Sequence, residues 1–463
     1  MSQARNALQD ILRQAGRPLS ETDPIAITGQ DPVLPTNFLI GTAGAAVIAA
    51  NGLAAADIWE LRTGKRQDVT LDMAAAAAAL RSDRYILVDG ESAPDPWSPI
   101  SGFYETGDAR WIQLHCNFPH HRDGVLALLG CEDDRNAVTA AIATWDGAVL
   151  EAALAEAQMC AGLVRRPAEW SALPHAKAVA ELPLIEIDRI GDSPREPFGD
   201  GARPLSGARV LDLTRVIAGP VCGRTLAEHG ADVLRIAAPH LPSVPSLVMD
   251  TGHGKRSAFL DLRNAEDQDR LRGLVCGADV FSQSYRPDTL ASRGFAPEDL
   301  AALRPGIVYV TLSAFGHEGP WRDRRGFDSL VQTVSGIAHE GGNGAGDGAP
   351  PRHLPAQALD YVGGYLGSLG AMIALARRAR EGGSYRVRVS LAQTGRWISE
   401  LGRTESDARD LHEQTREDVA DLGRETDTPF GRLWHVAPVV RLSETPPRWD
   451  NPAVPLGTHE PVW

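Results

Sequence analysis

The residue best suited to chemistry in this sequence is Asp360. It stands at or near the start of a segment with helical character, and glycines follow it at positions 363, 364, 367 and 370. The free N–H groups and the dipole at a helix start favour an ionised carboxylate, and nearby glycines let a substrate approach the backbone closely. An ionised, uncrowded carboxylate can act as a nucleophile. The same position also suits a plain helix cap or first-turn aspartate, which is a common structural role.

A group of histidines with one cysteine raises the question of a metal site. One short segment contains His115, Cys116, His120 and His121, and dense His and Cys residues are typical zinc ligands. No second cluster follows at zinc spacing, however, and Pro119 interrupts the element. We therefore expect packed or rim histidines and no metal.

A glycine-dense stretch spans residues 341–348. It lacks the spacing of a phosphate-binding loop with its lysine, and it does not follow a strand and open a helix as a dinucleotide-binding loop would. A mobile lid over a site and a plain flexible loop remain as interpretations.

Strand and helix patterns must position these residues. Pro and Gly are dense in residues 191–206, which predicts a linker between an N-terminal part, 1–190, and a second part, 207–463. The second part opens with a strand, a helix and a strand, an order typical of a parallel pair. Further strands alternate with helical stretches, which predicts an α/β fold with a doubly wound, mostly parallel sheet. In the first part, the mixture of strands and helices predicts a second, smaller α+β domain.

One helix-to-strand pattern recurs in the two parts. Residues 358–380 form a long helix rich in small residues that leads to a strand at 387–391, and residues 41–62 lead in the same way to 69–73. The two segments align without a gap and place Thr42 at the position of Asp360. Either a diverged internal duplication or two ordinary helix-to-strand connections would give this pattern, and Thr42 cannot act as a carboxylate in either case.

Length, charge and cysteine content exclude several classes of protein. The chain has 463 residues, 43% of them hydrophobic, and a formal net charge of −14. It shows no basic stripe for nucleic acid, no uncharged apolar stretch of ~18 residues for a membrane-spanning helix and no apolar N-terminal core of a secretory signal. Five cysteines without a Cys-x-x-Cys motif fit a reducing compartment. We therefore expect a cytoplasmic enzyme with no nucleic-acid and no membrane partner.

The second part also contains an ordered set of motifs. They are ARVLDLTRVIAGP at 208–220, LAEHGADVLRI at 226–236, GKRSAFLDL at 254–262, RPDTLASRGF at 286–295, LSAFGHEGP at 312–320, GFDSLVQ at 326–332 and DYVGG at 360–364. Together they resemble class III CoA-transferases, the family of the formyl-CoA and carnitine CoA-transferases. The resemblance covers about residues 207–395.

This resemblance implies a Rossmann-like α/β fold with a smaller second domain, assembled as an interlocked homodimer. It implies that Asp360 is a nucleophile that moves CoA from an acyl-CoA thioester to a small carboxylic acid, through aspartyl anhydride and aspartyl-CoA thioester intermediates. The CoA thioester is then a substrate, and no permanently bound cofactor is expected. The protein must supply positioning and oxyanion donors, for which backbone N–H groups near Gly363 and the 341–348 loop are the expected sources.

The resemblance further implies contacts to the nucleotide and pantetheine of CoA, chiefly from the first strand-to-helix loop and from the segment after the strand at 278–282. The expected CoA- or substrate-binding residues are Arg215, Val216, Ile217, Ala218, Gly219, Ser284, Tyr285, Arg286, Arg293, Phe315, Gly363 and Gly364. Two departures from the family pattern affect the phosphate contacts. Ala237 and Ala238 replace the usual charged residues, and Ser284 replaces a frequent Asn, which leaves Arg286 and Arg293 as available cations.

Two alternatives follow from further departures. A sister branch of the same fold racemises 2-methylacyl-CoA with a His at the position of Phe327, and Phe cannot exchange a proton. The order of parts is also unusual, because the small domain precedes the α/β part as if a back half were fused ahead of a front half. A racemase or isomerase and a non-catalytic acyl-CoA-binding homologue are therefore the alternatives to a CoA-transferase.

Overall fold

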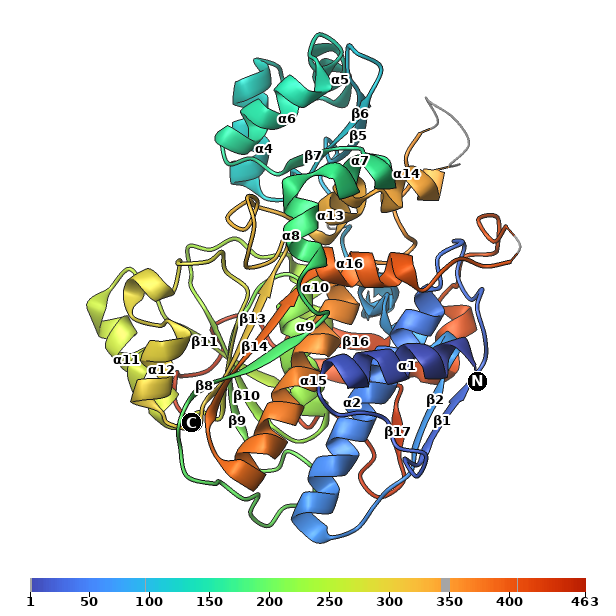
Figure 1. Ribbon diagram of the computed structural model, residues 1–463. Coiled ribbons are helices and arrows are strands. Elements are labelled where there is room, and N and C mark those ends of the chain that lie inside the picture. The colour runs from blue at the N-terminus through green and yellow to red at the C-terminus, as the bar shows by residue number, and fades with distance from the viewer. Residues whose placement is uncertain (1, 96, 343–349, 406) are drawn as a thin grey trace.

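A seven-stranded sheet forms the centre of the computed structural model, which describes residues 2–95, 97–342, 350–405 and 407–463 (Figure 1). The strand order is β11-β10-β9-β12-β13-β14-β8. Neighbouring strands pair in parallel, except that β8 is antiparallel to β14. The strands are β8 (Glu186–Gly191), β9 (Arg209–Leu213), β10 (Asp232–Ala237), β11 (Lys255–Phe259), β12 (Val280–Gln283), β13 (Val308–Ser313) and β14 (Ser384–Ser390).

Helices cover both faces of this sheet because successive strand residues point to opposite sides. Leu211 and Leu213 of β9 belong to the core formed with α11 and α12, whereas Val210 belongs to the core that includes α9 and α15. Figure 1 shows these two pairs of helices on opposite sides of the strands, which confirms the predicted doubly wound α/β fold. The helices of this part are α9 (Ala218–Glu228), α10 (Pro245–Thr251), α11 (Ala265–Cys276), α12 (Pro297–Leu303), α13 (Asp328–Ser335), α14 (Ile337–Gly342), α15 (Ala358–Glu381) and α16 (Leu391–Glu400).

A smaller α+β domain lies at one end of the molecule, at the top of Figure 1. It has its own core, formed between a three-stranded antiparallel sheet and the helices that cover it. The prediction of a second, smaller domain is therefore confirmed. Its elements are β5 (Gly102–Glu105), β6 (Trp111–Leu114), α4 (Pro119–Leu129), α5 (Arg135–Ile142), α6 (Gly147–Glu156) and β7 (Ala161–Leu163), and α7 (Pro167–Ala172) and α8 (Pro174–Ala180) follow it.

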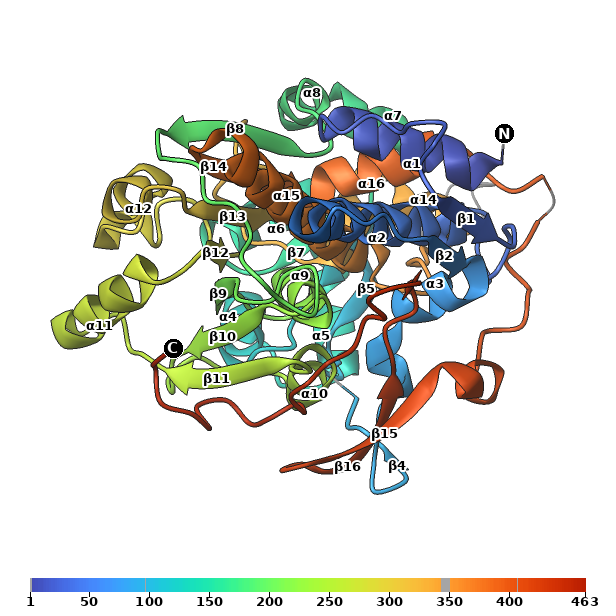
Figure 2. The same cartoon turned by 90° about the horizontal axis from the view of Figure 1, so that it is seen from below.

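Strands from the N-terminal part of the chain pair with strands from its C-terminal part. The N-terminal elements are α1 (Gln3–Gln14), β1 (Ile25–Thr28), α2 (Ile40–Thr63), β2 (Val69–Asp72), α3 (Met73–Ala79), the 3-10 turn η1 (Ser82–Tyr85), β3 (Leu87–Val88) and β4 (Glu91–Ser92). The remaining elements are η2 (Ala291–Arg293), η3 (Glu417–Leu422), β15 (Gly423–Thr428), β16 (Gly431–Val436) and β17 (Arg441–Leu442). Figure 2 shows β15 and β16 beside β4.

Strand pairing joins the parts expected on either side of the 191–206 linker. β8, from the N-terminal side, extends the central sheet at β14. In the opposite direction, the C-terminal strands β16 and β17 return to pair with β3 and β2. The parts 1–190 and 207–463 therefore share sheets. Each part contributes strands to a sheet of the other, so the two are not separate domains.

α2 with β2 and α15 with β14 match as two copies of one unit. Each helix has 24 residues. Each following strand lies between one parallel and one antiparallel neighbour, β1 and β17 for β2, and β13 and β8 for β14. Gly52 of α2 packs closely on Val69, as Gly370 of α15 packs on Val387. These equivalent contacts favour a diverged duplication over two ordinary connections.

The two repeated helices pack against each other through apolar and small residues. Within the described residues, α2 and α15 are long and apolar enough to cross a membrane, although the sequence argued against such a helix. In this fold 94% and 100% of their apolar windows are buried inside the protein. Two hydrogen bonds of Asn51 join them: Asn51 Nδ2 donates to Tyr365 O at 2.9 Å, and Ser368 Oγ donates to Asn51 Oδ1 at 2.6 Å.

We expect Asn51→Ala to lower the melting temperature, because it removes these bonds from a site that is 1% exposed. Each hydrogen bond lost contributes about 0.5–1.5 kcal/mol. Differential scanning calorimetry measures the change. Ser368→Ala is the companion variant and should also lower the melting temperature, because it leaves the buried Asn51 Oδ1 without its donor, which costs about 1–3 kcal/mol. An unchanged melting temperature for Asn51→Ala would show that these bonds do not hold the helices together.

Candidate active site

The carboxyl ends of β9 and β12 lie side by side where the strand order reverses, and open α/β sheets bind ligands at such a point. Arg215 and Val216 follow β9, and Ser284 follows β12. The Arg215 N–H donates to Ser284 Oγ at 3.4 Å. Val216 has a φ of 70°, which is rare for a β-branched residue. Strained residues of this kind gather at functional sites.

Asp360 lies in the first turn of α15 and is 7% exposed. The N-terminal donors of that helix are taken by a different carboxylate, because Asp328 Oδ2 accepts the N–H groups of Leu359 at 2.8 Å and of Asp360 at 3.0 Å. The backbone N–H of Ala218 instead faces the Asp360 side chain and partly offsets the rise in its pKa.

Burial and neighbouring carboxylates raise the pKa of Asp360 well above its ordinary value. Burial is the largest cause, followed by Asp328 and then Asp83. The pKa of Asp328 is itself raised to about 6, also chiefly by burial. The expectation of a carboxylate kept ionised by the helix start is therefore wrong, since Asp328 occupies those N–H groups and adds a like charge.

Two cavities meet at Asp360. One has a volume of about 570 Å³ and the other about 270 Å³. Asp360 is the acidic residue of the described chain that lines both, and the two share the wall residues Phe118, Val216, Ile217 and Phe327. A molecule with its reacting atom at Asp360 can therefore extend in two directions.

The larger cavity is cationic. Five arginines line it, and Asp360 is its single carboxyl group within the described residues. Arg322 and Arg324 pair with acidic neighbours, whereas Arg215, Arg286 and Arg325 form no ion pair with any residue that the structure describes. The surplus of positive charge suits an anionic ligand. Its predicted lining residues are Arg215, Val216, Ile217, Ala218, Gly219, Ser284, Tyr285 and Arg286, and all of them line it.

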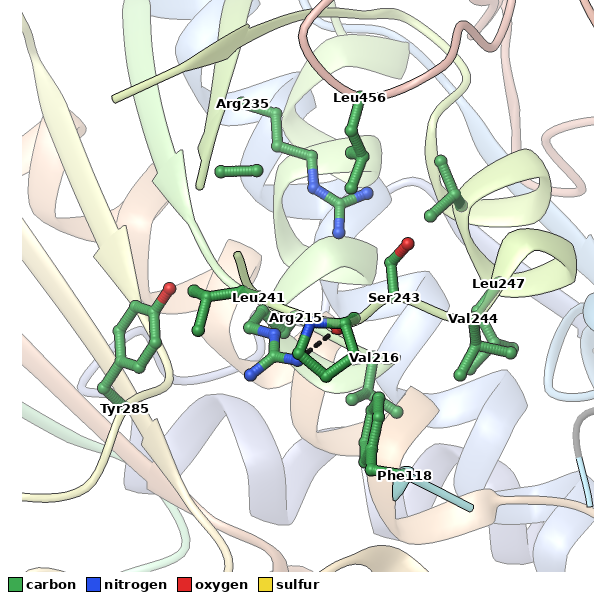
Figure 3. Close-up of a pocket in the computed structure, with 13 residues that line it drawn as sticks. Phe118, Arg215, Val216, Arg235, Leu241, Ser243, Val244, Leu247, Tyr285 and Leu456 are labelled. Carbon is green, nitrogen blue, oxygen red and sulfur yellow. Dashed lines mark hydrogen bonds between the residues drawn. The ribbon is translucent and has the colours of Figure 1, made fainter. Parts of the chain in front are cut away.

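A small annex extends this cavity toward β10 (Figure 3). Arg235 points into it, and Arg215 and Tyr285 lie on its opposite wall. Arg235 is 5% exposed, and its Nε and Nη1 atoms have no hydrogen-bond partner among the described residues. Because an unpaired buried charge is costly, the annex is a place where an anionic group would be stabilised. The small side chain of Ala237 also lines it.

Four of the expected binding residues line neither cavity. The Arg293 side chain donates to Thr289 O, and Phe315 is 2% exposed and packs edge-on against Trp321 at 5.5 Å. Gly363 faces Leu391, and Gly364 lets α15 approach Ala218 O of α9 closely. These glycines serve helix packing because they lie inside α15, past the first turn that carries Asp360. Of the glycine-dense loop, residues 343–349 lie outside the described residues.

Several lining residues were not predicted from the sequence. Arg322, Arg324 and Arg325 form a basic run directly before the motif at 326–332, and that run was the available signal. Trp97 and His115 line the smaller cavity from the N-terminal part, and no local pattern places them there. Among the described residues, no group of three or more His, Cys, Asp or Glu could hold a metal ion.

Comparisons with known proteins agree with this geometry. The sequence profile of "CoA-transferase family III" matches residues 19–186 and 205–418, in both parts of the chain. An acetyl-coenzyme A transferase of Hypoxylon pulicicidum is 32% identical over 360 residues, which cover 73% of this chain and 59% of that protein. An acyl-CoA transferase of Gibberella moniliformis is 27% identical, in an alignment that covers 93% of this chain and 89% of that protein.

Other relatives match over shorter regions. The succinate–glutarate CoA-transferase of Agrobacterium fabrum is 35% identical over 39% of this chain and 49% of that protein. A crystal structure of a CAIB/BAIF family protein from Brucella suis is 27% identical, covers 42% of this chain and 55% of that one, and has a TM-score of 0.38. The chain thus spans about half to three fifths of several relatives that it matches. Because the profile covers most of its residues, the chain belongs to CoA-transferase family III.

Proposed function

We propose that this protein transfers coenzyme A from an acyl-CoA thioester to a free carboxylic acid, with Asp360 as the nucleophile. The observation that carries the proposal is the position of Asp360 at the junction of a large cationic cavity and a smaller one. The phosphate groups of CoA match the unpaired arginines of the larger cavity. Named relatives include CoA-transferases that act on succinate and glutarate.

The proposed cycle exchanges one thioester for another. The Asp360 carboxylate attacks the thioester carbonyl, and the CoA thiolate leaves, which gives a mixed anhydride. The thiolate then attacks the aspartyl carbonyl, which releases the first acid as its carboxylate and leaves an aspartyl-CoA thioester. The acceptor carboxylate attacks that thioester, which forms a second anhydride and releases the CoA thiolate. The thiolate then attacks the acyl carbonyl of the acceptor, which gives the new acyl-CoA and the free Asp360 carboxylate. No ATP and no permanent cofactor enters this cycle.

The surroundings of Asp360 support this role. A raised pKa makes the carboxylate, once formed, more basic and hence a stronger nucleophile, and the ionised fraction grows with pH. Gly219 lies in the first turn of α9 and lines the larger cavity. Its backbone N–H is a candidate oxyanion donor in place of Gly363, because free N–H groups at a helix start stabilise developing negative charge.

The nucleophile is tested by Asp360→Asn and Asp360→Ala. Both should abolish transfer, with a loss of about 10⁴–10⁶ in rate by analogy with other covalent enzymes, since no anhydride can form. Hydroxylamine added with an acyl-CoA donor should convert the activated carboxyl group to a hydroxamate at residue 360, as mapped by peptide mass spectrometry. The adduct should require the donor.

Asp328→Asn is the matched control. It keeps an oxygen acceptor for the α15 N–H groups, removes the neighbouring charge and loses the bond from the Gln332 amide, so the hydroxamate should still map to residue 360. Near-normal transfer by Asp360→Asn without an adduct at that position would disprove the mechanism. If no donor gives transfer or an adduct, a non-catalytic acyl-CoA-binding homologue becomes the better account.

The racemase alternative is tested by hydrogen exchange. Phe327 stacks on His115 with ring centroids 4.0 Å apart, so an imidazole does lie beside the position where a racemase needs one. Burial lowers the pKa of His115 to about 3, which makes it a weak base. A chiral 2-methylacyl-CoA incubated with the enzyme in deuterium oxide should therefore keep its Cα hydrogen, as seen by NMR. Rapid enzyme-dependent uptake of deuterium would favour the racemase.

A homodimer in the cytoplasm is also part of the proposal. Its support is the interlocked dimer implied by the family resemblance and the five cysteines, all of which are free. Light scattering across a tenfold range of concentration should give about twice the mass of one chain. A monomer at every concentration would instead indicate that the N-terminal copy of the repeat takes the place of a partner chain.

A further inference from the structure

The two cavities beside Asp360 differ in chemistry, and this difference bears on which acids the protein uses. A thioester carbonyl held at Asp360 has sulfur on one side and the acyl group on the other. The pantetheine chain and the acyl group must therefore leave the reacting carbon in different directions. Because the larger cavity carries the unpaired arginines, it suits the phosphates of CoA, and the acyl group is left to the cavity of about 270 Å³.

The wall of the smaller cavity combines aromatic and aliphatic side chains with the neutral polar residues Asn117, Ser329, Gln332 and Gln357. Trp97 meets His115 edge-on with ring centroids 5.5 Å apart, and His115 stacks on Phe327. Burial keeps both of its histidines uncharged, since it lowers the pKa of His115 to about 3 and that of His353 to about 4. The apolar lining residues are Val216, Ile217, Val244, Leu247, Leu354 and Ala356.

The charged groups of this cavity are unfavourable to a second carboxylate. Asp83 and Asp328 line it together with Asp360. Its one arginine within the described residues, Arg84, keeps 35% of its side chain exposed and pairs with Glu413 at 3.2 Å. A dicarboxylic acid would therefore bring its far carboxylate toward two acidic side chains and a guanidinium that is already paired.

We propose that the acid handled by this protein is an apolar monocarboxylic acid, large enough to reach the wall formed by Trp97 and His115. The proposal rests on the proposed CoA-transferase function and specifies its substrate class. The small domain and the segment before it then determine specificity, because Trp97 and His115 both come from the N-terminal part of the chain. Trp97 is 36% exposed, so it can be replaced without opening the core.

The test is a competition between equal concentrations of 3-phenylpropanoate and succinate, with acetyl-CoA as donor and the product acyl-CoAs quantified by mass spectrometry. Phenylpropanoyl-CoA should exceed succinyl-CoA by about 10-fold or more, the size of effect that apolar pockets achieve. Equal or greater formation of succinyl-CoA would overturn the proposal while leaving the CoA-transferase function intact.

Three variants test which residues produce the preference for the apolar acid. Trp97→Ala should reduce the product ratio by about 10-fold, and the conservative Trp97→Phe should retain it, because a ring still closes the wall. Arg84→Ala should leave the ratio unchanged. If Arg84→Ala instead removes succinate use selectively, Arg84 binds a second carboxylate and the proposal is wrong. A ratio of two products is insensitive to a general loss of folded enzyme.

A binding measurement distinguishes failure of the substrate-class proposal from failure of the proposed CoA-transferase function. Calorimetric titration of the CoA-loaded protein with each acid needs no turnover. Tighter binding of 3-phenylpropanoate than of succinate would support the substrate class even if no acyl-CoA forms, in which case only the CoA-transferase function fails. Equal binding, or tighter binding of succinate, would disprove the substrate class in either case.

Discussion

The site depends on Asp328, a carboxylate that takes no part in the proposed reaction cycle. Asp328 accepts the N–H groups of Leu359 and Asp360 with one oxygen and the Gln332 amide with the other. These bonds fix where α15 begins and leave the Asp360 side chain free to face the two cavities. The same proximity places a like charge beside Asp360 and adds to the rise in its pKa that burial chiefly causes. Asp328 therefore contributes both to the stability of the helix start and to the basicity of the proposed nucleophile.

The first copy of the repeat retains this arrangement without the reactive group. Asp31 accepts the N–H groups of Gly41 at 3.2 Å and Thr42 at 2.7 Å, as Asp328 does at the start of α15, but Thr42 stands where the second copy has Asp360. The aspartate at the helix start is thus present in both copies, although the first copy has no carboxylate at the position of Asp360. Its helix, α2, now packs along α15, so one copy carries the proposed nucleophile and the other packs against it.

Local pattern predicted much of the fold, and the family resemblance supplied the predicted residues of the larger cavity. The helix at 358–381 lies within one residue of its expected position, and the predicted strand, helix and strand after the linker are β9, α9 and β10, because periodicity and glycine or proline breaks are local signals. The loop residues Arg215 and Ser284 came from the resemblance. Burial is not a local signal, so the raised pKa of Asp360 was missed. The contact of His115 with Phe327 joins residues about two hundred positions apart, and no sequence spacing indicates it.

The two cavities differ in charge because different segments of the chain contribute their arginines and their aromatic residues. The arginines beyond Asp360 come from the loop after β9, the segment after β12 and the run before α13, all parts of the α/β domain. The aromatic wall comes from the segment before β5 and from the end of β6. These elements pack on their own core. Under the proposed binding mode, changes at Trp97 and His115 would alter the cavity assigned to the acyl group and leave these arginines and Asp360 in place. The α/β domain still contributes to acid recognition, because Val216, Ile217 and Phe327 line that cavity as well.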